Sequence, residues 1–199
     1  VGMNKSYRTY FDGGTVYAGM PKHNGTGVWE GSGLVTHVIG SRQVPGVIVT
    51  GGRLTAVSNS TAAAIGGGGG YVAAGGQATV DIKGGYVYAY NHSIYAKEYK
   101  LFVPCVAIGG SSSVEEPATL TTINITGGHV FAQSKGGCAI GGGGSAQKAG
   151  GPANINISGS AYVEAKSLAG SISGHSFPAG SSIGGGTGGK NANTNGGYA

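Results

Sequence analysis

The sequence predicts an all-β fold: a parallel β-helix, in the form of a triangular β-solenoid of about five glycine-rich coils. Glycine accounts for 44 of the 199 residues, about three times its usual share of roughly 7 %. Charged residues make up only 10 % of the chain, whereas Val, Ile, Thr and Tyr occur in short alternating runs that are typical of strands. Two short sequence blocks also alternate along the chain, and repeats of this kind indicate a solenoid.

The first block is a strand-like run, a glycine pair and a second strand-like run. Its copies are YFDGGTVYA (10–18), VIVTGGRLTA (47–56), VDIKGGYVYA (80–89), INITGGHVFA (123–132) and INISGSAYVEA (155–165). In Val80-Asp81-Ile82 apolar and polar residues alternate, which is the period of a half-buried strand. Glycine adopts positive φ without steric cost. Each copy therefore predicts two strands joined by a sharp turn.

The second block is an apolar step into glycines. Its copies are VIGS (38–41), AAIGGGGG (63–70), VAIGGSSS (106–113), CAIGGGGS (138–145) and SSIGGGTGG (181–189). Ala-Ile-Gly-Gly predicts a small, tightly packed third side of each coil. The alternative for the glycine runs is a layer of polyproline-II-like strands packed closely together.

The spacing of the blocks separates a constant arc from a variable one. The interval from the second-block isoleucine to the following glycine pair is identical in three repeats: Ile65 to Gly84, Ile108 to Gly127 and Ile140 to Gly159. The other arc is short in some repeats, as from Gly127 to Ile140, and nearly twice as long in others, as from Gly84 to Ile108. Solenoids confine insertions in this way to one corner of the coil. We expect consecutive coils to stack about 4.8 Å apart through parallel ladders.

The pattern ITGGxVxA…AIGGG covers almost the whole chain, from about Tyr10 to Gly189, with degenerate copies such as Gly159-Ser160 in place of Gly-Gly. It resembles the glycine-rich repeats in large predicted surface proteins of bacteria and some protists. Those repeats are taken to be parallel β-helices. The resemblance therefore implies this fold, a cell-surface location and adhesive or structural use. It implies no catalytic residues.

Asparagine usage favours an extracellular protein. Six of the ten asparagines begin an Asn-x-Ser/Thr sequon: Asn4, Asn24, Asn59, Asn91, Asn124 and Asn156. Ser and Thr supply 33 of the 199 residues, so chance alone predicts about two sequons. Such sequons accept N-linked glycans in secreted proteins. Because Asn and Thr also suit β-turns and outward strand positions, the sequence leaves open whether these sites carry glycans.

The distribution of charge argues against two classes of partner. The formal net charge is +5, but the twelve Lys and Arg residues are scattered singly from Lys5 to Lys190. Proteins that bind nucleic acid cluster such residues on one face. No stretch approaches the roughly 20 continuous apolar residues of a membrane span. We therefore expect neither nucleic acid nor a membrane span.

The sequence predicts no enzyme, no cofactor and no metal site. Among the seven acidic residues only Glu115 and Glu116 are adjacent, and the following Pro117 indicates an exposed turn. The five histidines lack metal-ligand spacing. The run GGTGGK (185–190) lacks the Lys-Ser/Thr ending of a phosphate-binding loop.

The two cysteines, Cys105 and Cys138, both precede an Ala-Ile-Gly-Gly block. Stacked coils would place them within reach of a disulfide. However, Cys105 stands three residues before its isoleucine and Cys138 two, an offset that can turn the side chains to opposite faces. The sequence leaves two alternatives: a disulfide, or two small buried thiols.

The expanded arcs, residues 19–37, 90–104 and 166–180, provide the candidate contact surface. They hold five prominent aromatic residues: Trp29, Tyr95, Tyr99, Phe102 and Phe177. Aromatic side chains on a ridge can stack on sugars or anchor a protein partner. Alternatively, they cover the stack of coils and form a minor core.

We expect residues 1–199 to form a single β-solenoid domain, either a segment of a longer chain or a filament subunit. Neither end looks like the polar cap that solenoids normally carry. The predicted function is an extracellular structural protein that self-associates end to end into a cell-surface filament or matrix. The alternative is an adhesin or carbohydrate-binding module of a surface protein.

Overall fold

The computed structural model describes residues 8–11, 15–19, 22–23, 29–30, 34–36, 46–70, 74, 76–172, 174–189 and 197, and it describes side chains from Val47 onward. The regular elements in these ranges are all strands. None of the described residues belongs to a helix that is long and apolar enough to cross a membrane.

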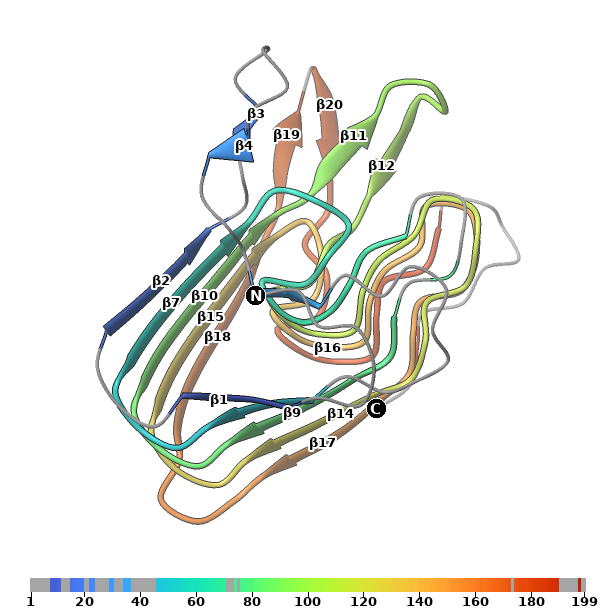
Figure 1. Cartoon of the computed structure of the whole chain (residues 1–199). Coiled ribbons are helices and arrows are strands. Elements are labelled where there is room, and N and C mark those ends of the chain that lie inside the picture. The colour runs from blue at the N-terminus through green and yellow to red at the C-terminus, as the bar shows by residue number, and fades with distance from the viewer. Residues whose placement is uncertain are drawn as a thin grey trace.

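Three parallel sheets of five strands each make up most of the fold (Figure 1). The first sheet has the order β1 (Arg8–Phe11), β6 (Gly46–Val49), β9 (Ala78–Ile82), β14 (Thr121–Ile125), β17 (Ala153–Ile157). The second has the order β2 (Thr15–Gly19), β7 (Arg53–Ser58), β10 (Tyr86–His92), β15 (His129–Lys135), β18 (Tyr162–Leu168). The third has the order β5 (Leu34–Thr36), β8 (Ile65–Gly67), β13 (Ile108–Gly109), β16 (Ile140–Gly141), β21 (Ile183–Gly184). Each repeat of the sequence therefore contributes one strand to each sheet.

Three antiparallel pairs lie within the expanded arcs. They are β3 (Lys22–His23) with β4 (Trp29–Glu30), β11 (Ile94–Ala96) with β12 (Leu101–Val103), and β19 (Gly170–Ile172) with β20 (His175–Phe177). These short pairs extend away from the parallel sheets, and the last two lie side by side (Figure 1). The insertions thus pair with themselves instead of lengthening the parallel ladders.

The hydrophobic core lies between the three sheets and consists of equivalent residues stacked in register. On the second sheet, Leu54, Val87 and Val130 lie next to one another in neighbouring strands and are buried. On the third sheet Ile108 is paired with both Ile65 and Ile140, and all three isoleucines are inaccessible to solvent. Burying a side chain of this size contributes about 1.5–3 kcal/mol. The inward residues of the alternating pattern are therefore the main source of stability.

Glycine is required where the strands of the third sheet meet. Gly109 has a φ of +139°, and a Cβ atom at this position would overlap the main-chain carbonyl oxygen of Gly141 in the next strand. A side chain of any size would force the two strands apart. The Ala-Ile-Gly-Gly block is thus explained by one buried isoleucine followed by a backbone contact that only glycine permits.

A ladder of polar residues, three of them buried and the last, Ser167, half-buried, follows the core residues of the second sheet. Ser58, Asn91, Ser134 and Ser167 occupy equivalent positions in neighbouring strands. Each side chain hydrogen-bonds main-chain carbonyl groups; the Ser134 hydroxyl, for example, donates to the carbonyl oxygen of Cys105 over 2.6 Å. The ladder satisfies backbone groups that irregular segments would otherwise bury unpaired.

The expectation of a triangular β-solenoid, a closed all-parallel β-helix, is wrong. The described residues form three parallel sheets together with antiparallel pairs, and they show no closed solenoid. In the third sheet β8, β13, β16 and β21 contain only two or three residues, because in each of them an isoleucine is followed by a glycine with φ between 135 and 153°, outside the ordinary β region. The hydrogen-bonded ladders of the third sheet end at these glycines. The expanded arcs form separate antiparallel hairpins.

Candidate functional site

The outward side of the second sheet carries aromatic side chains in neighbouring strands. Tyr86 of β10 is in register with His129 of β15, which is in register with Tyr162 of β18. Two residues further along the same two strands, Tyr88 is paired with Phe131. We call these five residues the aromatic face. Their outward position follows from the inward position of Val87 and Ala89, because successive strand residues point to opposite sides.

The rings of the aromatic face contact one another but remain accessible. Tyr86 and His129 stack with ring centroids 4.8 Å apart, and Tyr162 lies 5.6 Å from His129 and 5.9 Å from Phe131. The exposed fractions of Tyr86 and Tyr162 are 53 % and 52 %, which is high for residues of this size. A side of a sheet with several exposed rings is a typical contact surface.

Polar groups and shallow hollows surround these rings. A hollow of about 290 Å³ lies beside Tyr86, Tyr88 and Phe131, where Arg53 also contributes. The Arg53 guanidinium carbon lies 6.0 Å from the centroid of the Tyr86 ring, within the range of a cation–π contact. A second hollow of about 140 Å³ lies on the other side of Tyr88 and Phe131.

Charged and amide groups line the second hollow: Gln133, Glu164 and Lys166. The Lys166 ammonium group forms an ion pair with the Glu164 carboxylate, and this hydrogen-bonded contact raises the pKa of Lys166. The neighbouring Tyr90 also has a raised pKa, because it is partly buried and lies near Tyr88. The aromatic face is therefore bordered by hydrogen-bond donors and acceptors.

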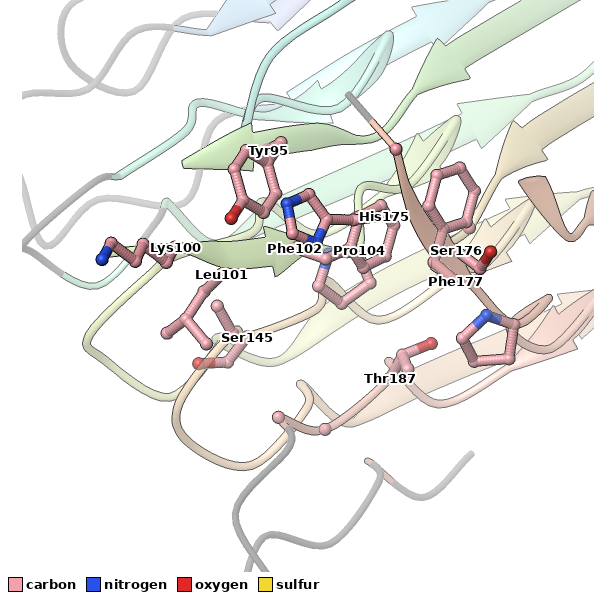
Figure 2. A pocket seen from close by; sticks show the side chains of 16 residues that line it. Tyr95, Lys100, Leu101, Phe102, Pro104, Ser145, His175, Ser176, Phe177 and Thr187 are labelled. Carbon is pink, nitrogen blue, oxygen red and sulfur yellow. The ribbon is translucent and has the colours of Figure 1, made fainter. Parts of the chain in front are cut away.

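A larger cavity of about 550 Å³ lies between the two neighbouring hairpins, β11–β12 and β19–β20 (Figure 2). We call it the hairpin cleft. The ring of Tyr95 stacks on that of His175 with centroids 4.4 Å apart, and the ring of Phe102 stacks on that of Phe177 at 4.2 Å. The rings within each pair are close to parallel, with interplanar angles of 11° and 10°. Ring stacking thus joins two insertions that are far apart in the sequence.

The lining of the cleft combines these rings with polar groups. Lys100, Ser145, Ser176 and Thr187 line it, and none of its described lining residues is acidic. Lys100 is the last residue of the β11–β12 turn and has a φ of +52°. No other described residue except glycine has a positive φ.

The structure brings together three of the five predicted contact residues. Tyr95, Phe102 and Phe177 all line the hairpin cleft. Tyr99 is half-buried and instead packs against a small hydrophobic cluster that contains Val103. Trp29 belongs to β4, but its side chain lies outside the described residues.

The prediction missed the aromatic face, although its signal is present in the first block. In GGYVYAY the inward residues are Val87 and Ala89, so that Tyr86, Tyr88 and Tyr90 alternate with them. In GGHVFA, His129 and Phe131 occupy the equivalent positions. Sequence reasoning that compares the outward residues of successive repeats would have found the face.

The predicted sequons differ in environment. Asn59 and Asn156 are exposed, whereas Asn91 is fully buried. The Asn124 side-chain amide donates a hydrogen bond of 2.8 Å to the Asp81 carboxylate. Asn4 and Asn24 lie outside the described residues.

Both cysteines are buried free thiols, so the structure matches the second of the two alternatives and not the disulfide. Cys105 packs in a cluster that contains Ala96 and Val103, whereas Cys138 packs against Ala63 and Val106. The one-residue offset before the isoleucine has placed them in different clusters. Burial raises the pKa of each thiol to about 12.

The described residues contain no group of three or more His, Cys, Asp or Glu side chains that could hold a metal ion. Comparison of the chain with known protein families, curated proteins and solved structures finds no match.

Proposed function

We propose that this chain is an extracellular surface protein that binds polysaccharide through the aromatic face. The observation that carries the proposal is the row formed by Tyr86, His129 and Tyr162 across three adjacent strands. Neighbouring parallel strands lie about 4.8 Å apart. Rings in successive strands therefore form a nearly continuous surface on which the apolar faces of successive sugar units can stack.

The surroundings of the rings suit the same ligand. Sugar hydroxyl groups need hydrogen-bond partners beside the stacking surface, and Arg53, Gln133 and Glu164 border the two hollows. Tyrosine provides a large contact area while losing little conformational entropy, because only two side-chain torsions must be fixed. The strands that carry the rings are held by in-register ladders and by the buried core. The binding surface is thus largely formed before any ligand arrives.

The test is retention on insoluble polysaccharides, with cellulose, chitin and mannan as the probes. We expect the protein to bind at least one of them, and we expect the triple variant Tyr86→Ala, Tyr88→Ala, Tyr162→Ala to bind at least tenfold more weakly. The matched control is Leu120→Ala, which removes another exposed apolar side chain, from a position that is not part of the aromatic face. Its binding should be unchanged.

The replaced tyrosines are about half exposed and lie outside the buried core, so the triple variant should still fold, with a moderately lower melting temperature. Failure to bind any of the three polysaccharides, or equal binding by the triple variant, would remove the aromatic face as a binding surface.

A second candidate function is that of a structural subunit. It is favoured by the exposure of core-type isoleucines in the last repeat. Ile157 and Ile183 are 39 % and 45 % exposed, whereas their register partners Ile125 and Ile140 are inaccessible. In the described part of the chain, β17, β18 and β21 each pair with a parallel neighbour on one side only. The β1, β2 and β5 edge of a second copy would extend all three ladders and cover these isoleucines.

Size-exclusion chromatography and negative-stain electron microscopy test this second function. Long fibres of uniform width should form, and Ile157→Lys should shorten or abolish them by placing a charge in the end-to-end contact. Leu120→Lys adds the same charge at an exposed site and should leave the fibres intact. Discrete monomers at high protein concentration would contradict the structural function but not the polysaccharide binding.

A further inference from the structure

We propose that the hairpin cleft is a second binding site, which accommodates a single anionic sugar unit: a pyranose that carries a carboxylate. The inference rests on the proposed function only in that the ligand is a saccharide. The cleft lies between hairpins formed by the expanded arcs, whereas the aromatic face lies on the outward side of the second parallel sheet. The two sites therefore have different walls and can be tested separately.

The size of the cleft suits a small ligand. Its volume is about 550 Å³, within the range of roughly 300–1,000 Å³ that is usual for sites of small molecules. The rings of Tyr95, His175 and Phe102 contribute apolar surface to its walls, and the buried Phe177 ring supports that of Phe102. A pyranose can stack its apolar side on such rings while its hydroxyl groups face the serine and threonine residues of the lining.

The walls of the cleft are held in place by close packing. Gly136 has a φ of +96°, and a Cβ atom there would overlap the Phe102 ring and approach Cδ2 of Phe177 to 2.6 Å. A Cβ atom on Gly170 would lie 2.9 Å from Cζ of Phe177. The two phenylalanine rings thus pack directly on the backbone at two glycines. Binding would require little rearrangement, which lowers the entropic cost of holding a ligand.

The charge of the lining points to an anion. Lys100 lines the cleft, and the described lining residues include no carboxylate. Among the described residues the one ion pair is Lys166 with Glu164, so Lys100 has no carboxylate partner there. An ammonium group at the edge of an aromatic cleft can form a charge-assisted hydrogen bond with the carboxylate of a bound sugar.

The backbone at Lys100 supports the same conclusion. Its φ of +52° is one that Gly or Asn adopts with less strain than other residues. A four-residue hairpin loop accounts for the backbone conformation but not for the choice of lysine. Lys100 lines the edge of the cleft, and in Figure 2 its long side chain extends outward from that edge, away from the stacked rings, so a bound anion would be met by a reorientation of this flexible side chain.

Isothermal titration calorimetry on the whole chain tests the inference. The probe is a soluble tetrasaccharide of alternating glucuronate and N-acetylglucosamine units, and neutral cellotetraose is the comparison ligand. We expect the acidic tetrasaccharide to bind at least tenfold more tightly than cellotetraose. Its affinity should fall as salt is added, because salt screens the interaction between the carboxylate and Lys100.

Two lysines of the same turn form a matched pair of variants. Lys100→Asn removes the cation from the cleft and also relieves the unfavourable φ, so binding should weaken at least tenfold while the melting temperature stays the same or rises. Lys97→Asn removes a charge from the same turn, but Lys97 does not line the cleft, and the affinity of this variant should be unchanged. Loss of binding by a variant at least as stable as the native protein cannot be attributed to misfolding. Tyr95→Ala should weaken binding as well, through loss of the stacked ring.

Several outcomes would overturn the inference. These are no binding of the acidic tetrasaccharide, equal affinity for cellotetraose, and unchanged affinity in Lys100→Asn. Binding of a sulfated tetrasaccharide but not of the carboxylated one would contradict the proposal that the cleft recognises a carboxylate. The triple tyrosine variant of the aromatic face should bind the acidic tetrasaccharide normally. If it does while it no longer binds insoluble polysaccharide, the two sites are independent; loss of both would contradict a separate site in the cleft.

Discussion

The side-chain amide of Asn91 donates a hydrogen bond of 2.7 Å to the main-chain carbonyl oxygen of Val106. A second bond of 2.8 Å goes to the carbonyl oxygen of Ala62. Asn91 therefore bridges two segments that lead into β8 and β13, the third-sheet strands of successive repeats. The equivalent residues Ser58 and Ser134 each donate one such hydrogen bond through the hydroxyl group, to the carbonyl oxygens of Ala62 and Cys105.

Replacement of Asn91 by alanine should reduce the free energy of unfolding by about 2–4 kcal/mol, because two buried carbonyl groups lose their donor. Asn91→Ser restores the residue found in the neighbouring repeats and should cost less, since its hydroxyl can still donate to one carbonyl. Urea denaturation of the three proteins measures the difference. A loss for Asn91→Ala below about 0.5 kcal/mol, the lower end of what one hydrogen bond contributes, would show that the amide bridge is unimportant.

The environments of the sequons predict which of them carry glycans in the folded protein. After secretion from a eukaryotic host, peptides that contain Asn59 and Asn156 should be modified, because both side chains are exposed. Asn91 should be unmodified, since its amide is buried and donates two hydrogen bonds. Glycopeptide mass spectrometry distinguishes the sites. A glycan on Asn91 in folded, monodisperse protein would contradict the buried position of this residue.

The row of isoleucines in the third sheet predicts that replacement by alanine costs much more stability in the middle of the row than at its end. Ile108→Ala removes a side chain in the middle of the ladder and should cost about 2–5 kcal/mol, because it leaves a cavity in a packed core. Ile183→Ala changes the last residue of the same ladder, where 45 % of the side chain is exposed, and should cost less than about 1.5 kcal/mol. Chemical denaturation gives both values. Equal losses would mean that the end of the core is covered in solution, as self-association would cause.

The glycines of the third sheet provide a second matched pair. Gly109 and Gly184 have similar φ values of +139° and +149°, so alanine is strained to a similar degree at both. A Cβ atom on Gly109 overlaps the carbonyl oxygen of Gly141, whereas on Gly184 the nearest atom is Cβ of Ser181 at 3.6 Å. Gly109→Ala should therefore prevent folding or lower the melting temperature strongly, and Gly184→Ala should cost about 1–2 kcal/mol. Circular dichroism during heating separates the two outcomes, and similar curves would show that the strand contact is loose.

The buried thiols predict a loss of stability at alkaline pH. Burial raises the pKa of Cys105 and Cys138 from an ordinary value of 9.0 to about 12. Between these pH values the unfolded chain releases protons that the folded chain retains, so their contribution to stability is complete below pH 9 and falls as the pH rises towards 12. The double variant Cys105→Ala, Cys138→Ala should lose less stability between pH 8 and about 10.5 than the native protein does. Denaturation curves at both pH values provide the measurement, and equal losses would contradict buried thiols.

Much of the local structure follows from the sequence alone. The alternation in Val80-Asp81-Ile82 predicts a strand with Val80 and Ile82 inside, and β9 has this burial pattern. The glycine pairs predict turns, and Gly85 indeed has a φ of +85° at the turn before β10. These features depend on neighbouring residues and on the strand period of two, so a short stretch of sequence is sufficient to determine them.

The same period would have placed Asn91 on the inward side, in line with Val87 and Ala89. The sequon motif takes no account of this direction, because it records only which residues follow the asparagine. The sequon predicts an exposed Asn91, whereas the alternation along the strand predicts a buried one. In the structure Asn91 is buried.

The sequence by itself determined where the later repeats lie, which of their residues alternate inward and outward, and where glycine is needed for turns, but the first strand of the third sheet is Leu34–Thr36 and not the expected block at 38–41. Only the tertiary structure decided that the sheets remain separate, that the cysteines enter different clusters, and that Tyr95 meets His175. The physical reason is distance along the chain: those two rings belong to insertions of different repeats, and no local preference can specify their contact. They meet because the two insertions leave the stacked repeats at the same corner and bury their apolar sides against each other.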